Sequence, residues 1–292
     1  MFPLMTFACR NTCNKTRLDQ FIDLNRRFLD VTELEDSEMA AFDSYTRMLL
    51  SSEPGLDWKG LLLSRIVVIL GEAGSGKTWE LRYRASALRK EGVFAFFVPL
   101  ESLVGSQLVE AFAPEDERSY LEWKDTSSEA TFFLDSVDEA KVRKQQDFVR
   151  ALNSFVRGVG HPTLQRVRVV VSSRISEWRS KADGDVLLQR LGDAIQQVKG
   201  DAATDDSSAP DFRIVQLEPL DNERVRKFAE ETGLPNPESF IDAIDTHYAW
   251  EFARRPIDVA DLANYWREDG KLGTLTELIE FDLLNKLKET PE

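Results

Sequence analysis

The chain has 292 residues, of which 42% are hydrophobic and 30% are charged, a globular composition long enough for one large domain with an accessory domain or for two modest ones. Its formal net charge is −14, from 51 acidic and 37 basic residues, which argues against a protein that coats nucleic acid, because that requires clustered Lys and Arg. No apolar stretch approaches the roughly 18 residues of a membrane span, so we expect a cytoplasmic protein without membrane contact.

The first part of the chain is predicted to be helical. Between residues 15 and 52, the segments LDQFIDLNRRFL and MAAFDSYTRMLL place apolar residues three and four positions apart, as an amphipathic helix does. The segment SSEPG then ends the pattern. Because residues 1–57 contain no paired catalytic motif, we interpret them as a helical N-terminal adaptor or linker.

The middle of the chain alternates apolar strands with helical segments. Short apolar or β-branched runs at 65–70, 93–100, 131–135, 166–173 and 212–220 are typical of buried strands. Segments with helical periodicity separate them, including WELRYRASALRKEG and AKVRKQQDFVRALNSFVRGVG. This alternation predicts an α/β domain over residues 58–220, with a parallel sheet flanked by helices. The polar segment KGDAATDDSSAPD, residues 199–211, is predicted to be a disordered loop.

After residue 220 the strand pattern stops. The segments NERVRKFAEETG, PESFIDAIDTHYAW, PIDVADLANYWRED and TLTELIEFDLLNKLKE read as four helices separated by Gly and Pro. Residues 221–292 are therefore predicted to form a small helical domain, which we interpret as a lid.

A glycine-rich motif follows the first predicted strand of the α/β domain. The strand RIVVIL leads into GEAGSGKT and then into a helix, which is G-x-x-x-x-G-K-[ST] in the strand–loop–helix context of a P-loop. Glycines let backbone N–H groups approach phosphate oxygens, and the helix N-terminus adds positive charge. A nucleoside di- or triphosphate with Mg²⁺ is the expected cofactor. The predicted cofactor-binding residues are Gly71, Glu72, Ala73, Gly74, Ser75, Gly76, Lys77 and Thr78.

Three carboxylates follow the third predicted strand, TFFLD. Asp135 ends the strand and is predicted, together with the Thr78 hydroxyl, to hold Mg²⁺, because ligands of open parallel sheets lie beyond the carboxyl ends of the strands. Asp138 and Glu139 begin the next turn, where a carboxylate can orient the attacking water. Either could instead cap the following helix. We favour Glu139 as the residue that orients the water.

A third group, Arg174, follows the strand RVRVVVSS. A guanidinium just beyond a neighbouring strand can contact the γ-phosphate of ATP. By itself an arginine at such a position is typical of a surface. In order after the P-loop and the Asp135 strand, it becomes a predicted catalytic residue.

Together these motifs resemble the NACHT branch of the STAND P-loop NTPases. The apolar strand followed by Asp135, Ser136, Val137, Asp138 and Glu139 is similar to the Walker B segment of that family, and Ser172, Ser173 and Arg174 are similar to its sensor segment. RRPID, residues 254–258, is similar to the helical-domain segment whose proline packs near adenine, which implies a nucleotide contact for Pro256.

The resemblance implies a five-stranded parallel sheet of the ASCE type, with strand order 5-1-4-3-2. It also implies a switch in which ADP accompanies a closed monomer and ATP an open, self-associating form, used by prokaryotic members in defence against phage. Those proteins continue into a winged-helix domain and repeats, so we expect the chain to be part of a longer protein or a shortened relative.

Three alternatives remain beside a slow, regulatory ATPase. A nucleotide-gated scaffold would bind without turnover and would need only Asp135 of the three carboxylates. A P-loop kinase would need a lid with several arginines, whereas Arg254 and Arg255 form the only adjacent pair in the helical segment. An AAA+ ATPase would need an arginine finger acting between subunits, which no motif clearly supplies.

Overall fold

The computed structural model describes residues 21–34, 46, 55–137, 145–192, 210–274, 276–280 and 283. The chain divides into two compact units. The larger unit runs from Asp23 to Asp221 and also includes Arg255–Ile257. The described residues of the smaller unit lie in 21–22, 222–254 and 258–283. The segments 138–144 and 193–209, which include Asp138, Glu139 and most of the predicted loop, are outside the described residues.

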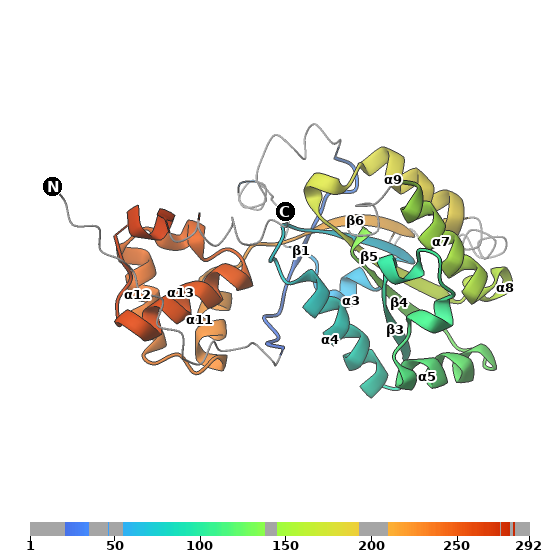
Figure 1. Ribbon diagram of the computed structural model, residues 1–292, viewed down its shortest axis with the longest axis horizontal. Helices are drawn as coiled ribbons and strands as arrows, with labels where there is room; N and C mark the ends of the chain where they lie inside the picture. Colours follow the sequence, from blue (N-terminus) through green and yellow to red (C-terminus); the bar gives the residue numbers. More distant parts are fainter. Residues whose placement is uncertain are drawn as a thin grey trace. The chain divides into compact units, whose positions relative to one another are not determined.

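A mostly parallel sheet forms the centre of the larger unit (Figure 1). Among the described residues it runs in the order β1-β6-β2-β5-β4-β3. Strands β2 to β6 pair in parallel, and β1 pairs antiparallel with β6 at the edge. The strands are β1 (Phe28–Asp30), β2 (Ile66–Leu70), β3 (Phe94–Pro99), β4 (Ala130–Asp135), β5 (Val167–Ser173) and β6 (Phe212–Leu217).

Strand β1 corrects two expectations. The predicted sheet had five strands, numbered 1 to 5, which correspond to β2 to β6. The observed sheet has a sixth strand, β1, outside β6, so its order differs from the predicted 5-1-4-3-2. The helix predicted over residues 18–29 is also wrong in its described part, since residues 21–27 are irregular and 28–30 form a strand. The backbone of Phe28 exchanges hydrogen bonds of 2.9 and 2.7 Å with Leu56, and the Glu218 N–H donates to the Arg27 carbonyl at 3.0 Å. These long-range bonds satisfy the backbone groups that a helix would have used.

Helices cover both faces of this sheet (Figure 1). Residues of α5, α7 and α9 pack on one face, and residues of α3 and α4 pack on the other. The described helices of this unit are α3 (Trp58–Leu61), α4 (Lys77–Lys90), α5 (Pro114–Lys124), α7 (Gln145–Val159), α8 (His161–Leu164) and α9 (Ser180–Leu187), with shorter turns η1 (Leu100–Leu103), η2 (Leu108–Ala111), η3 (Ile175–Glu177) and η4 (Leu188–Gly192).

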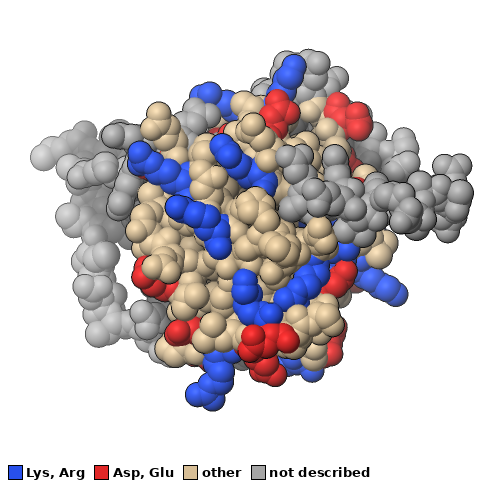
Figure 2. All heavy atoms as spheres, turned by 90° about the vertical axis from the view of Figure 1, so that its right-hand side faces the viewer, with Lys and Arg blue, Asp and Glu red and all other residues tan. Residues whose placement is uncertain are grey.

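The surface of the larger unit carries charges of both signs. Figure 2 shows Lys and Arg side chains across the middle of one face, with Asp and Glu side chains mainly toward its edges. Basic and acidic side chains thus occupy different parts of this face.

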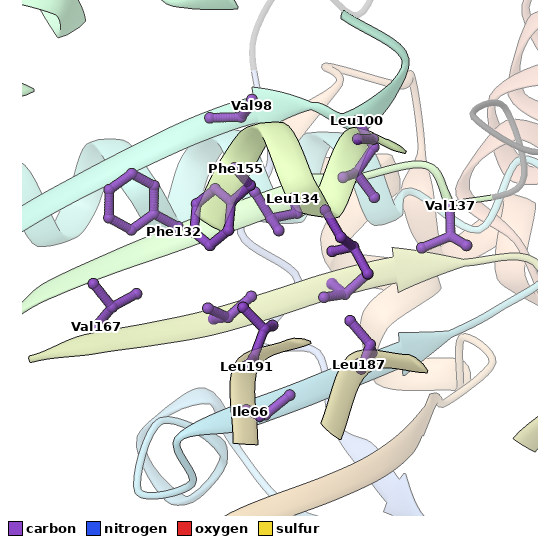
Figure 3. Close-up of a cluster of buried hydrophobic side chains, with 14 of the residues drawn as sticks. Ile66, Val98, Leu100, Phe132, Leu134, Val137, Phe155, Val167, Leu187 and Leu191 are labelled. Atoms are coloured by element: carbon purple, nitrogen blue, oxygen red, sulfur yellow. The ribbon is translucent and has the colours of Figure 1, made fainter. Parts of the chain in front are cut away.

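Alternate residues of the buried strands feed two separate hydrophobic cores. Phe132 and Leu134 of β4 pack with Phe155 of α7 and Leu187 of α9 (Figure 3), whereas Phe133, between them in sequence, packs on the α4 side. Successive side chains of a strand point to opposite faces, so a strand covered on both sides must be apolar throughout. Packing on both faces holds the strands in register, and this places the carboxyl ends of the parallel strands, where the predicted site residues lie, side by side.

The smaller unit is helical. Its described helices are α11 (Asn222–Glu231), α12 (Pro237–Thr246) and α13 (Pro256–Asp269), and residues 276–280 are also helical. The first two residues of α13 belong to the larger unit, and the turn η6 (Ala249–Phe252) precedes this helix. Phe240 of α12 and Trp266 of α13 meet edge to face, with ring centroids 5.7 Å apart. No helix in the described part of the chain combines the length and apolar character needed to cross a membrane.

Candidate functional site

The predicted phosphate-binding motif forms a tight loop between β2 and α4. All five residues of β2 are buried, and α4 begins at Lys77 directly after the glycine-rich segment. Gly74 and Gly76 have φ angles of 70° and 94°, and Gly76 is the N-cap of α4. Side chains other than glycine rarely adopt these angles, so the glycines allow the abrupt turn from strand to helix. This is the strand–loop–helix geometry of a P-loop.

The loop is also too closely packed to accept side chains at two of its glycines. A Cβ on Gly71 would lie 2.8 Å from the Ser75 hydroxyl oxygen, and a Cβ on Gly74 would overlap the Ile257 side chain. Ser75 is buried, and its hydroxyl has no hydrogen-bond partner among the described residues. A bare backbone loop with a buried, unsatisfied hydroxyl fits a site that receives a polar ligand.

Lys77 lies over the loop rather than away from it. Its ammonium group donates to the carbonyl oxygens of Gly71 and Glu72, at 2.8 and 3.0 Å. These contacts hold a positive charge at the N-terminus of a 14-residue helix, where the helix dipole also favours an anion. Thr78, the second residue of α4, is half-buried. The loop thus brings a cation and a hydroxyl to one end of the sheet.

Asp135 lies at the carboxyl end of β4, as predicted, and is tied to the neighbouring strand. It is buried, and its carboxylate accepts a hydrogen bond of 2.5 Å from the Ser172 hydroxyl of β5. The same hydroxyl accepts a 2.9 Å bond from the backbone N–H of Ser136, whose φ is 62°. Ser172 therefore fixes both the Asp135 side chain and the turn that follows β4.

The register of the sheet brings the predicted motifs to one edge. Leu70 of β2 pairs with Ser173 of β5, and the Gly71 N–H donates to the Ser173 carbonyl at 3.2 Å. Arg174 comes next and is exposed at the start of η3. Since Asp135 bonds to Ser172, the loop, the carboxylate and the arginine all follow the same ends of adjacent strands.

The structure does not test the two carboxylates predicted to act on water. Asp138 and Glu139 are outside the described residues, so their roles stay predictions. In the described part of the chain, no three His, Cys, Asp or Glu side chains converge to hold a metal ion. The Thr78 hydroxyl and Asp135 would hold a Mg²⁺ ion together with oxygens of the bound phosphates, which suits its preference for water and phosphate ligands.

Residues outside the predicted motif also contact the loop. Within the larger unit, the Arg255 guanidinium donates to the Ala73 carbonyl at 2.7 Å. Pro256, predicted to contact adenine, places its ring carbon Cγ 3.5 Å from where a Cβ on Gly76 would lie. The sequence does not predict this contact of Arg255, because only its position next to Pro256 points to the loop.

A second set of residues that the sequence does not assign to the site supports the loop from the protein interior. Arg26 is buried and donates to the Ser75 carbonyl, and the buried Glu80 of α4 accepts a 3.1 Å hydrogen bond from the Trp58 indole. Burial raises the pKa of Glu80 above its ordinary value, and the Arg26 charge and the Trp58 bond oppose that rise. The sequence around Arg26 has helical periodicity, and Arg26 is 49 residues from Ser75. No local sequence signal therefore assigns Arg26 to the site.

No protein-family model and no curated protein matches the chain. Among solved structures, it is similar to a replication initiator DnaA bound to AMPPCP and single-stranded DNA, with 16% identity and a TM-score of 0.44, over 72% of this chain and 57% of that one. It is also similar to AMPPCP-bound DnaA from Aquifex aeolicus, with 17% identity and a TM-score of 0.41, over 78% and 62%.

A third similar structure is an Hsp104–ADP complex from S. cerevisiae, with 14% identity and a TM-score of 0.39, over 83% of this chain and 33% of that one. This chain thus spans less than two thirds of the length of each of these three. We infer function from the residues of the site.

Proposed function

We propose that the chain binds ATP and ADP at the loop between β2 and α4 and hydrolyses ATP slowly, as a regulatory switch of the NACHT-like STAND type. The observation that supports this most directly is the P-loop geometry of Gly71–Thr78, with Lys77 held over the loop by its bonds to two loop carbonyls. Asp135 and Ser172 lie at the carboxyl ends of the adjacent strands β4 and β5, and Arg174 follows β5.

In this proposal each residue has a separate task. The loop N–H groups and Lys77 bind the β- and γ-phosphates, and Thr78 and Asp135 hold Mg²⁺, which would offset the charge of the phosphates. Arg174 contacts the γ-phosphate, and Glu139 orients the attacking water, with Asp138 as its alternative. Pro256 contacts the nucleotide beside the loop.

The biological role that we propose follows from the resemblance of the motifs to NACHT proteins. ATP favours a self-associating state and hydrolysis resets it, in signalling or in defence against phage. Residues 221–292 act as the helical lid, and residues 1–57 act as an adaptor whose strand β1 completes the sheet.

Nucleotide binding is tested with a fluorescent ADP analogue. We expect Lys77→Ala to abolish binding, because the cation over the loop is lost. The matched control is Lys90→Ala, which removes the same charge from the exposed last residue of the same helix and should bind as the wild type does. Unchanged affinity in Lys77→Ala would refute the P-loop assignment.

Turnover is tested by the release of phosphate from ATP. We expect slow hydrolysis in the wild type, and retained ATP binding with little hydrolysis in Glu139→Gln. A wild type that binds ATP without turnover would instead support a nucleotide-gated scaffold. Arg174→Ala should weaken ATP binding more than ADP binding, whereas equal losses would contradict a γ-phosphate contact.

A further inference from the structure

Arg26 links two backbone segments that are far apart in the sequence. Its guanidinium donates from one nitrogen to the Ser75 carbonyl of the loop, at 2.9 Å, and from the other to the Glu218 carbonyl beyond β6, at 2.5 Å. The side chain is only 3% exposed. A planar fork of donors can bridge two carbonyls in this way, which a lysine ammonium does less well.

The bond to Ser75 has a consequence for the next residue of the loop. The described residues contain no cis peptide bond, so the Ser75 carbonyl and the Gly76 N–H point in opposite directions across their shared peptide group. By holding the carbonyl, Arg26 directs the Gly76 N–H away from itself, along the opposite direction within the same peptide plane. Gly76 has a φ of 94° and is the residue most able to rotate away if the bond is lost.

A buried carboxyl group interacts electrostatically with Arg26. The buried carboxyl group of Glu80 lies within its electrostatic reach, one helical turn after Lys77, and is itself fixed by the Trp58 indole. A buried guanidinium is costly unless it is paired and hydrogen-bonded. Arg26 has two hydrogen-bonded carbonyl partners and an electrostatic interaction with Glu80, so its position is well determined.

Arg26 also lies next to an element that is fixed to the sheet. Phe28 of β1 pairs with Leu217 of β6, and its side chain is fully buried. A change in the Ser75–Gly76 peptide group is therefore connected through a single side chain to the edge strand of the sheet.

We propose that Arg26 is a positioning residue that holds the Ser75–Gly76 peptide group in the orientation that binds a nucleotide phosphate, and so couples occupancy of the loop to the β1 segment. This inference rests on the proposed nucleotide function. Coupling free energies are reciprocal. If the Arg26 contacts strengthen nucleotide binding, then bound nucleotide stabilises the Arg26 contacts, and with them the β1 segment, by the same free energy.

The test compares two adjacent arginines. Arg26→Gln removes the buried bridge, whereas Arg27→Gln removes the same charge from an exposed side chain and is the matched control. We expect Arg26→Gln to bind a fluorescent ADP analogue about tenfold more weakly, the scale of losing a charged hydrogen bond, while Arg27→Gln binds normally. The KM for ATP should rise by a similar factor with little change in kcat, because the contact is present before and during the reaction.

Hydrogen exchange of the full chain without nucleotide provides a second readout. We expect faster exchange in residues 71–78 of Arg26→Gln and unchanged exchange in β4 and β5, which a general loss of stability would not produce. Arg26→Lys, which keeps the charge but not the fork, should give the same local effect and serves if Arg26→Gln does not fold. Normal affinity together with normal exchange in the Arg26 variants would overturn the proposal.

The two proposals fail in different ways. If the wild type binds no ADP, the nucleotide function fails and the coupling to Arg26 fails with it, and faster exchange in residues 71–78 of Arg26→Gln would then show only that Arg26 holds the loop. If Lys77→Ala loses binding while Arg26→Gln and Arg26→Lys bind normally, the nucleotide function stands and the role of Arg26 is refuted.

Discussion

At the scale of single residues, the Ser172 hydroxyl joins two strand ends. It donates to the Asp135 carboxylate and accepts from the Ser136 N–H, and all of this lies at the buried edge of the sheet. Removing it leaves a buried carboxylate and a backbone donor each short of a partner. This cost exceeds that of losing one exposed hydrogen bond.

We therefore predict that Ser172→Ala lowers the free energy of unfolding by about 1–3 kcal/mol. The neighbouring Ser173→Ala is the control, since Ser173 is equally buried but its hydroxyl makes a longer, 3.3 Å bond to the Arg174 carbonyl. It should cost less than about 1 kcal/mol. Urea denaturation of both variants measures the difference, and equal losses would show that the Ser172 bridge contributes nothing particular.

Glu80 gives a prediction about pH. Burial raises the pKa of this carboxyl above its ordinary value of 4.5, although the Arg26 charge and the Trp58 bond act against that rise. Between the unfolded and the folded pKa, the folded state binds more protons than the unfolded state, so this group's contribution to stability is lost as pH rises through that window.

Glu80→Gln removes this titration. We expect the stability of the wild type relative to Glu80→Gln to fall as pH rises from below 4.5 through the raised pKa of Glu80, and to level off above it. Urea denaturation of both proteins at a series of pH values measures the difference. A difference in stability that stays constant across the series, or that rises with pH, would contradict the raised pKa.

At the scale of elements, β1 is a three-residue edge strand supported by one large side chain. Phe28 is fully buried and meets the Trp58 ring edge to face, with centroids 4.9 Å apart. Short edge strands gain little from their own hydrogen bonds, so side-chain packing must hold them in place.

Phe28→Ala is thus expected to destabilise the larger unit by about 3–5 kcal/mol, as large-to-small changes of a buried aromatic do. Leu29→Ala, on the same strand but only half-buried, should cost clearly less. Thermal unfolding of the two variants, with hydrogen exchange in β6, measures the effect. If Leu29→Ala is as damaging as Phe28→Ala, the packing of Phe28 on Trp58 is not what fixes β1.

The same strand shows what could be predicted from the sequence. Strands β2 to β6 each contain a largely apolar, mostly buried run, such as IVVIL in β2 and TFFL in β4, and these runs predict where the strands lie. Phe28 instead follows Phe21 and Leu24 at helical spacing, and β1 forms only because β6 and Leu56 offer partners from distant parts of the chain. Tertiary pairing overrides local periodicity here.

The candidate site divides in the same way. Gly71–Thr78 is a local motif whose loop geometry is encoded by its own glycines, and Asp135 follows from the strand that it ends. Arg26 and Arg255 contact carbonyls 49 and 182 residues away, and neither carries a motif. Residues that act by supporting a loop from outside are recognised only when the fold brings them to it.

At the scale of the whole molecule, charge controls the proposed self-association. Copies that each carry a net charge of −14 repel one another, and each bound nucleotide adds further negative charge. The Lys and Arg side chains across the middle of the face in Figure 2 offer local sites of opposite sign. The proposed association therefore requires dissolved salt to screen the long-range repulsion between copies, while short-range contacts between opposite charges remain.

Salt should accordingly favour the ATP-dependent assembly. Screening lengths are about 30 Å at 0.01 M salt and about 8 Å at 0.15 M, so raising salt across this range removes most of the repulsion between copies. We expect the mass measured by light scattering with ATP to increase with salt, and the mass with ADP to remain that of a monomer. Lys77→Ala is the control and should stay monomeric with either nucleotide. Assembly that is equal with ATP and ADP, or that persists in Lys77→Ala, would separate self-association from the nucleotide and contradict the switch.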